Sequence, residues 1–155
     1  MNKPLDTTLS LEIANNIKSK AKESFNNAFL ATKLLKESMY VQGFLATTGK
    51  PYKPIEHCWL EFEDRIVDPT LPHLNRTEQE LYYFPAQRLS VKQLLAAVEE
   101  AKEDYPDDPP LPVYGDAPYE YYGDVMLGGH DYQVAYKQAL AKCKELNRPK
   151  SHEMN

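Results

Sequence analysis

Two β-prone runs separated by only two residues place the strongest constraint on the fold of this chain. The runs cover residues 55–62 and 65–68, and Glu63-Asp64 lies between them. A two-residue connection joins neighbouring antiparallel strands, because parallel strands need a crossover of a dozen or more residues. The middle of the chain is therefore predicted to hold an antiparallel hairpin.

Helical and strand-like patterns surround this hairpin in an order that favours an α+β fold. Apolar residues recur at helical spacing in four segments, which are 9–22, 24–35, 90–104 and 131–146. Further β-prone runs occupy 39–46 and 81–84, the second of them predicted to stop at Pro85. Strands do not alternate with helices, so we expect helices packed on a small antiparallel sheet rather than a parallel βαβ architecture.

The length of the chain limits the number of domains. With 155 residues there is room for one core, so we expect a single α+β domain over residues 1–147. Residues 105–129 have the composition of a long loop, rich in Pro, Gly and Tyr. The polar residues 148–155 are predicted to form a disordered tail.

Charge and hydropathy exclude several classes of partner. The formal net charge of −5 argues against nucleic acid, because phosphate binding needs a concentrated basic surface. No run approaches the roughly 20 apolar residues of a membrane span, and the N-terminus lacks the apolar stretch of a secretory signal. We therefore expect a cytoplasmic protein that binds neither nucleic acid nor membrane.

The residues that hold metals and cofactors do not occur at suitable spacings. Cys58 and Cys143 are too few for a disulfide framework and lack zinc-type spacing. The four histidines form no metal motif, and the six glycines are too scattered for a phosphate loop. The sequence predicts no metal and no cofactor.

The hairpin brings a histidine and an aspartate together. With the turn at Glu63-Asp64, His57 and Asp68 fall on the same face of neighbouring strands, because side chains alternate with a period of two. A carboxylate in that place fixes the tautomer of the imidazole, which can then take up and return a proton. These are the base and the orienting member of a catalytic triad, and a nucleophile is still required.

The predicted hairpin carries two short motifs, which are His57, Trp59 and Glu61 at alternate positions and then Asp68-Pro69-Thr70. These motifs resemble the histidine and aspartate strands of the transglutaminase-like, papain-related cysteine enzymes. In that family, and in related uncharacterised bacterial and phage proteins, the nucleophilic cysteine opens a helix in a pattern similar to Cys-aromatic-x-Asn-Ala. A Tyr-Val-x-Gly strand follows it. This chain has SFNNA at 24–28 and YVQG at 40–43, so Ser24 stands at the nucleophile position.

The resemblance, which covers roughly residues 23–83, implies a papain-like architecture and roles for particular residues. Ser24 would be the nucleophile and its backbone N–H an oxyanion donor, His57 the general base and acid, and Asp68 the orienting carboxylate. The reaction would be hydrolysis or acyl transfer at an amide, thioester or ester carbonyl of a peptide, a protein or a small acyl substrate. Candidate substrate-binding residues are Asn27, Gln42 and Trp59. The glutamine that papain-like enzymes carry some six residues before the nucleophile is absent, because Lys18 stands there.

Serine at this position changes the chemistry. A cysteine paired with histidine can hold a thiolate at neutral pH, whereas a serine hydroxyl must lose its proton in the transition state. We therefore expect weak or no turnover, and three explanations remain open. The cysteine has been replaced, or the chain is a pseudoenzyme that binds a peptide or protein, or it is a genuine Ser-His-Asp hydrolase.

Ordinary structural roles compete with these assignments. Ser24 is also a good helix N-cap, and Asn27 and Gln42 could serve structural hydrogen bonds or face solvent. Cys58 follows His57 directly and is expected to point the opposite way, into the core. The tyrosines of the long loop, at 114, 119, 121 and 122, are expected to line or cover the cleft together with Trp59.

Overall fold

The computed structural model describes residues 3–148 and shows an α+β fold, as predicted. The helices are α1 (Thr7–Ile17), α2 (Ser24–Thr32), α3 (Val91–Asp104) and α4 (His130–Leu146). The main sheet is antiparallel with the order β3-β2-β1-β4, formed by β1 (Met39–Thr47), β2 (Ile55–Phe62), β3 (Arg65–Val67) and β4 (Leu81–Ser90). A second, two-stranded sheet contains β5 (Tyr119–Tyr122) and β6 (Val125–Gly128). The predicted tail lies, from residue 149 onward, outside the described residues.

The predicted β2–β3 hairpin is present. Leu60 pairs with Val67 and Phe62 with Arg65, and the turn residues Glu63 and Asp64 take φ values of 50° and 61°. Positive φ at both central residues gives a turn whose twist matches that of the flanking strands. Because Asp68 directly follows β3, this register places it beside β2.

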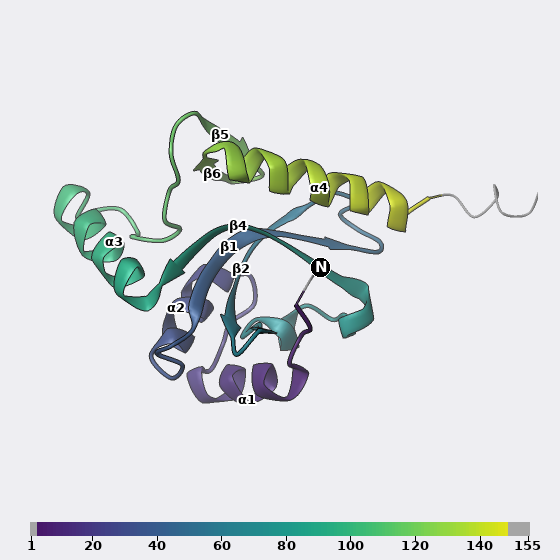
Figure 1. Cartoon of the computed structure of the whole chain (residues 1–155), viewed down its shortest axis with the longest axis horizontal. Helices are drawn as coiled ribbons and strands as arrows, with labels where there is room; N and C mark the ends of the chain where they lie inside the picture. Colours follow the sequence, from purple (N-terminus) through teal and green to yellow (C-terminus); the bar gives the residue numbers. More distant parts are fainter. Residues whose placement is uncertain (1–2, 149–155) are drawn as a thin grey trace, which may run out of the picture.

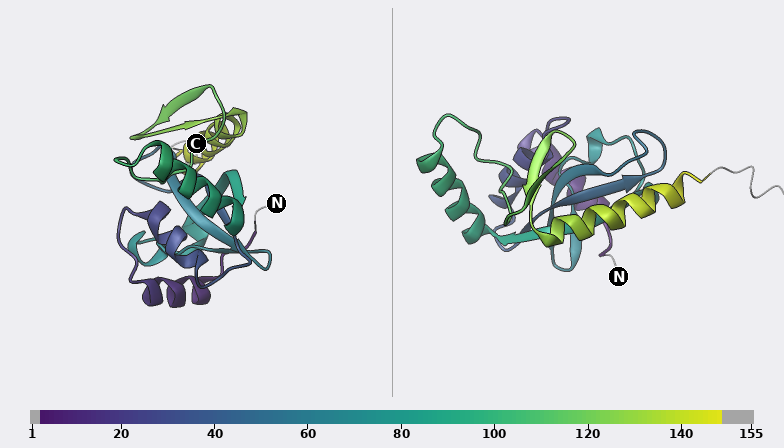
Figure 2. Two further views of the ribbon diagram at one scale, coloured as in Figure 1. Left: turned by 90° about the vertical axis from the view of Figure 1, so that its left-hand side faces the viewer. Right: turned by 90° about the horizontal axis from the view of Figure 1, so that it is seen from above.

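The alternating side chains of β1 contribute to three hydrophobic clusters. Tyr40 packs in the cluster that contains α2 and α3, and Phe44 packs in the cluster that contains α4. Val41 and Leu45 point the other way and join Trp59 in the third cluster. Figure 1 shows α4 lying across β1 and β4, with β5 and β6 beside its first turns. In Figure 2, α3 lies at one end of the molecule and α4 runs along the sheet toward the other.

Two predicted boundaries are wrong. Strand β4 continues through Pro85 to Ser90, because β4 is an edge strand and Pro85 sits where the register with β1 shifts, opposite Gly43. A proline on an edge or at a bulge removes no required hydrogen bond. Helix α1 ends at Ile17 rather than Lys22, because Lys18 takes the left-handed conformation with a φ of 56° and closes the helix.

The segment 105–129 is not a plain loop. It contains β5 and β6, which are joined at Gly123-Asp124. Helix α4 begins at His130, one residue earlier than predicted, and Gly129 is its N-cap. Within residues 3–148, none of the helices is long and apolar enough to cross a membrane.

Candidate active site at the start of helix α2

The structure brings His57 and Asp68 together. His57 Nε2 lies 2.7 Å from Asp68 Oδ2, and both side chains are buried, with 3% and 0% of their surface exposed. The carboxylate accepts the Nε2 proton, so in the neutral ring the lone pair is on Nδ1. Among the described residues, His57 Nδ1 has no hydrogen-bond partner. It is also not one of the unpaired side-chain atoms that are fully enclosed by protein, which are Trp59 Nε1 and Arg76 Nε. The imidazole is therefore oriented with one free basic nitrogen.

Asp68 is held from several directions. Tyr83 Oη donates to Asp68 Oδ2 at 2.7 Å, and the Thr70 N–H donates to Oδ1 at 2.9 Å. The backbone N–H of Asp68 donates to Ser10 Oγ at 2.9 Å, which connects α1 to the site. With the bond from His57, the carboxylate accepts three hydrogen bonds, so its burial is compensated.

Tyr83 is a site residue that the sequence did not reveal. Burial raises the pKa of its phenol well above the usual value, and the nearby charge of Asp68 and the hydrogen bond to it act in the same direction. The phenol therefore stays protonated and donates to Asp68. Tyr83 reaches Asp68 from β4, an edge strand whose pairing with β1 cannot be read from residue spacing.

Trp59 supports His57 from the same face of β2. The two rings stack with centroids 6.1 Å apart and planes inclined by 23°, and Trp59 also packs edge-on against Tyr83 at 5.0 Å. Trp59 has no exposed surface, so its position gives it a scaffolding contact and not a place on an open cleft wall. Gly43 makes this packing possible, because a Cβ there would collide with the Phe84 carbonyl oxygen and lie 3.0 Å from the indole.

Ser24 lies beside the histidine strand. It is the first residue of α2, and its Oγ accepts the backbone N–H of Cys58 at 3.2 Å, so Ser24 is not the N-cap. Because that nitrogen is bonded directly to the carbonyl carbon of His57, Ser24 Oγ is next to the backbone of His57. The described residues contain no hydrogen bond between Ser24 and the imidazole. Ser24 is 7% exposed.

Asn27 links the two parts of this site. Its Nδ2 donates to Thr70 Oγ1 at 2.9 Å and to the Lys20 carbonyl at 2.8 Å, and its Oδ1 accepts the Lys20 N–H at 3.1 Å. Thr70 in turn donates its N–H to Asp68. Asn27 is 2% exposed, so it fixes the approach to α2 against the Asp68 loop and is not placed to contact a substrate.

Gln42 is not brought into this site. It pairs with Cys58 in the sheet register, so its side chain lies on the face opposite His57. Its Nε2 donates to the Val113 carbonyl at 2.8 Å and to Tyr132 Oη at 2.7 Å, and its Oε1 accepts the Val113 N–H at 2.9 Å. Gln42 is completely buried and ties the segment before β5 to the sheet.

Two further expectations can be compared with the structure. Cys58 is completely buried beside Tyr40 in the first cluster, as predicted, and burial raises the pKa of its thiol. The loop tyrosines do not cover His57. Tyr122 packs on Phe44 at 5.3 Å, on the opposite face of β1, while Tyr121 is 72% exposed.

The structure therefore joins His57 to Asp68 and places Ser24 against the Cys58 backbone, next to His57 in the chain. Gln42 and Trp59 make structural contacts, Gln42 with Tyr132 and Trp59 with the His57 ring. In residues 3–148 no group of three or more His, Cys, Asp or Glu side chains is arranged to hold a metal ion. Comparison of the chain with protein-family models, with curated proteins and with solved structures finds no match.

Proposed function

We propose that Ser24, His57 and Asp68 form an acyl-transfer site of the cysteine-hydrolase type, with serine at the nucleophile position. One observation carries this proposal. The 2.7 Å bond between His57 Nε2 and Asp68 leaves Nδ1 free on the same strand that receives Ser24 at the N-terminus of α2. The substrate would be a peptide, a protein or a small acyl compound, attacked at an amide, thioester or ester carbonyl.

Each group has a defined part in such a reaction. Asp68 keeps the ring in place, and His57 Nδ1 takes the proton of the nucleophile and passes it to the leaving group. The Cys58 N–H supports negative charge on the nucleophile, since it already donates to Ser24 Oγ. The positive end of α2 and the Ser24 N–H stabilise the oxyanion.

Serine makes this site a weak catalyst. Among the described residues the Ser24 hydroxyl makes no hydrogen bond with His57, and its oxygen accepts the Cys58 N–H. A thiol at the same position can ionise beside the imidazole before the substrate arrives. Turnover by the chain with Ser24 should therefore be low.

The same contact favours a second candidate function, a binding module without turnover. With Ser24 Oγ accepting the Cys58 N–H, the hydroxyl has a structural partner that does not involve the His57 imidazole. In this alternative the chain is a pseudoenzyme whose pocket binds a peptide or protein. The hydrogen bond between His57 and Asp68 then stabilises the fold and has no part in a reaction.

Alkylation of the Ser24→Cys variant separates the two candidates. Iodoacetamide is applied at pH 6 and pH 8, and labelling is located by peptide mass mapping. The wild-type chain is the background, because Cys58 and Cys143 are buried and burial raises the pKa of both thiols. The double variant with His57→Ala is the matched control.

We expect labelling at position 24 that is already fast at pH 6, and slower by at least about tenfold without His57, because a thiolate forms only beside the imidazolium. Slow labelling at pH 6 that is indifferent to His57 would overturn the acyl-transfer proposal and leave the binding module.

A further inference from the structure

A cavity of about 320 Å³ lies between α2, α3 and residues 109–111. Apolar side chains form most of its lining, with Phe25 and Phe29 one turn apart on α2, Val98 on α3, and Leu111 on the connecting segment. The volume is at the lower end of the range of small-molecule sites, roughly 300–1,000 Å³. The cavity can therefore hold a small apolar group.

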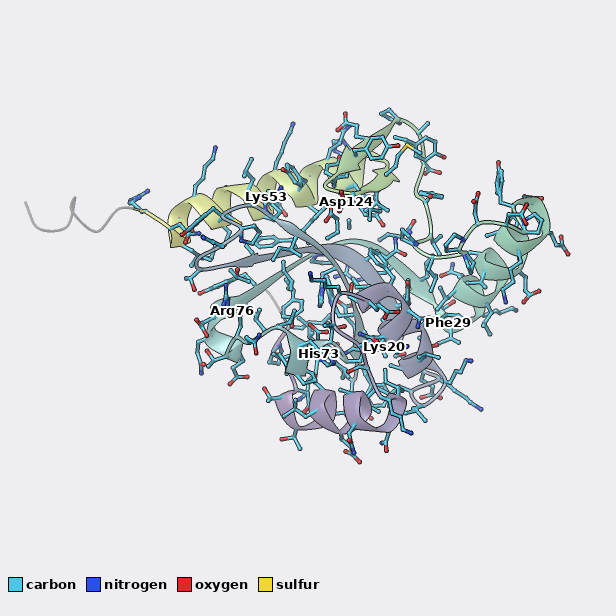
Figure 3. The ribbon with its side chains drawn as sticks, turned by 180° about the vertical axis from the view of Figure 1, so that it is seen from behind. Lys20, Phe29, Lys53, His73, Arg76 and Asp124 are labelled. Atoms are coloured by element: carbon cyan, nitrogen blue, oxygen red, sulfur yellow. The ribbon has the colours of Figure 1, made fainter. Side chains whose placement is uncertain are left out.

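The lining of the cavity begins in the same helical turn as the proposed nucleophile. Glu23 and Phe25, the two neighbours of Ser24, both belong to it. Successive residues of a helix point about 100° apart, so Ser24 faces β2 while Phe25 faces the cavity. Figure 3 shows Phe29 on the side of α2 nearer α3, with Lys20 and His73 on the side away from it. The cavity therefore begins directly beside the proposed nucleophile, at its two neighbours in the chain.

The outer wall of the cavity is anchored. Both backbone polar groups of Val113, two residues beyond Leu111, are bound by the buried amide of Gln42 at 2.9 and 2.8 Å. Leu111 and Val113 also pack against the first hydrophobic cluster. Gln42 therefore fixes the cavity wall to the face of the sheet that carries α2 and α3, opposite the face of His57.

The charges around the cavity cancel. Glu23 and Lys102 are its ionisable lining residues, one acidic and one basic. A neutral apolar ligand fits this lining better than a strongly charged one, because the desolvated wall offers no net compensating charge. We propose that the cavity binds the apolar chain of an acyl ester, thioester or amide whose carbonyl group lies at Ser24. This assignment rests on the proposed acyl-transfer function and names its substrate class.

Binding is tested first without any reaction, on the wild-type chain. Octanamide and acetamide are titrated separately, and backbone amide shifts are followed by NMR. We expect octanamide, but not acetamide, to shift the backbone amides of residues 25–29, 98–102 and Leu111. The Phe29→Trp variant, which adds bulk inside the cavity, should weaken octanamide binding at least tenfold. Leu95→Trp, on an exposed position of α3 outside the lining, is the matched control and should bind as the wild type does.

Reactivity is tested second, with p-nitrophenyl acetate and p-nitrophenyl octanoate on the Ser24→Cys variant. We expect faster acylation by the octanoate, and loss of that preference when Phe29→Trp is added. Octanamide binding without any acylation would overturn the acyl-transfer function and keep an apolar-ligand cavity. A different pair of results would keep the acyl-transfer function and overturn the assignment of the cavity to the acyl chain. These results are equal acylation by the two esters, and octanamide shifts that are absent or unchanged in the Phe29→Trp variant. Shifts produced by an apolar peptide but not by octanamide would also overturn it.

Discussion

The two halves of the candidate site are built very differently. On the His57 side, the Asp68 carboxylate accepts three hydrogen bonds and the imidazole stacks on Trp59, with almost no exposed surface. On the Ser24 side, a single hydrogen bond from the Cys58 N–H holds the hydroxyl, and a cavity begins at its neighbours. The fold holds the His57 side chain rigidly, whereas the Ser24 side chain can be exchanged without rebuilding its surroundings. Substitutions on the His57 side should therefore lower the free energy of unfolding more than substitutions on the Ser24 side.

Removing the Asp68 carboxylate should have the largest effect. Asp68→Ala leaves the His57 and Tyr83 side chains and the Thr70 N–H without their buried acceptor. We expect the free energy of unfolding to fall by about 3–5 kcal/mol, measured by urea denaturation. Asp104→Ala, on an exposed position at the end of α3, is the control and should cost little. A loss below about 1 kcal/mol for Asp68→Ala would show that the base is not rigidly held.

Asn27→Ala should come next, because this side chain joins the two halves. It breaks three hydrogen bonds that connect the approach to α2 with Thr70. We expect a loss of about 2–3 kcal/mol in the free energy of unfolding, and faster amide exchange at Lys20. Asn26→Ala changes the exposed neighbour and should leave both quantities nearly unchanged. Equal behaviour of the two variants would contradict the linking role of Asn27.

Tyr83→Phe removes one donor to Asp68 and keeps the ring. We expect a loss of about 1–2 kcal/mol at neutral pH. Burial raises the pKa of the Tyr83 phenol in the folded state, whereas a tyrosine in the unfolded chain ionises at about pH 10. The stability that Tyr83 provides is therefore complete below that pH. Above it, the unfolded state loses a proton that the folded state keeps, which lowers the wild-type free energy of unfolding by roughly 1.4 kcal/mol per pH unit.

The phenylalanine variant should therefore lose stability less steeply than the wild type above about pH 10, in denaturation curves recorded at several pH values. Tyr82→Phe is the matched control at neutral pH, because its ring contact with Lys142 does not need the hydroxyl. Parallel alkaline curves for the wild type and Tyr83→Phe would show that Tyr83 is not buried as a donor.

Ser24→Ala should have the smallest effect on stability. It removes one acceptor, for the buried Cys58 N–H, and leaves the three hydrogen bonds to the Asp68 carboxylate in place. We expect a loss of about 0.5–1.5 kcal/mol by urea denaturation. A loss larger than that of Asn27→Ala would mean that the Ser24 hydroxyl is a structural anchor and would favour the binding module.

The parts of the fold that depend on local spacing could be predicted. The Glu63-Asp64 turn fixed the hairpin register, and with it the approach of His57 to Asp68. Periodicity located the four helices and the strands β1 and β2 to within a few residues of their bounds, except at the end of α1. Both signals act over a few residues, so they are contained in the sequence itself.

The parts that depend on distant pairing could not be predicted. Tyr83 acquires its role from β4 lying beside β1, and Gln42 acquires its partners from Val113, 71 residues away. Gln42 and Trp59 are both completely buried, and this burial gives them structural contacts in place of the predicted contacts with a substrate. The continuation of β4 through Pro85 depends on the edge position of that strand, which is a property of the finished sheet.

The contact between Ser10 and Asp68 has a consequence for how the chain folds. It joins residues 58 positions apart, and the Ser24 contact with Cys58 spans 34 positions. Contacts of such long range form late, after the loop-closure entropy of the intervening chain has been overcome. A fragment that begins after α1 would lack the hydroxyl that accepts the Asp68 N–H, even with the whole hairpin present. The site is therefore a property of the assembled chain, and a fragment limited to residues 23–83, the span of the sequence motifs, should not hold Asp68 in place.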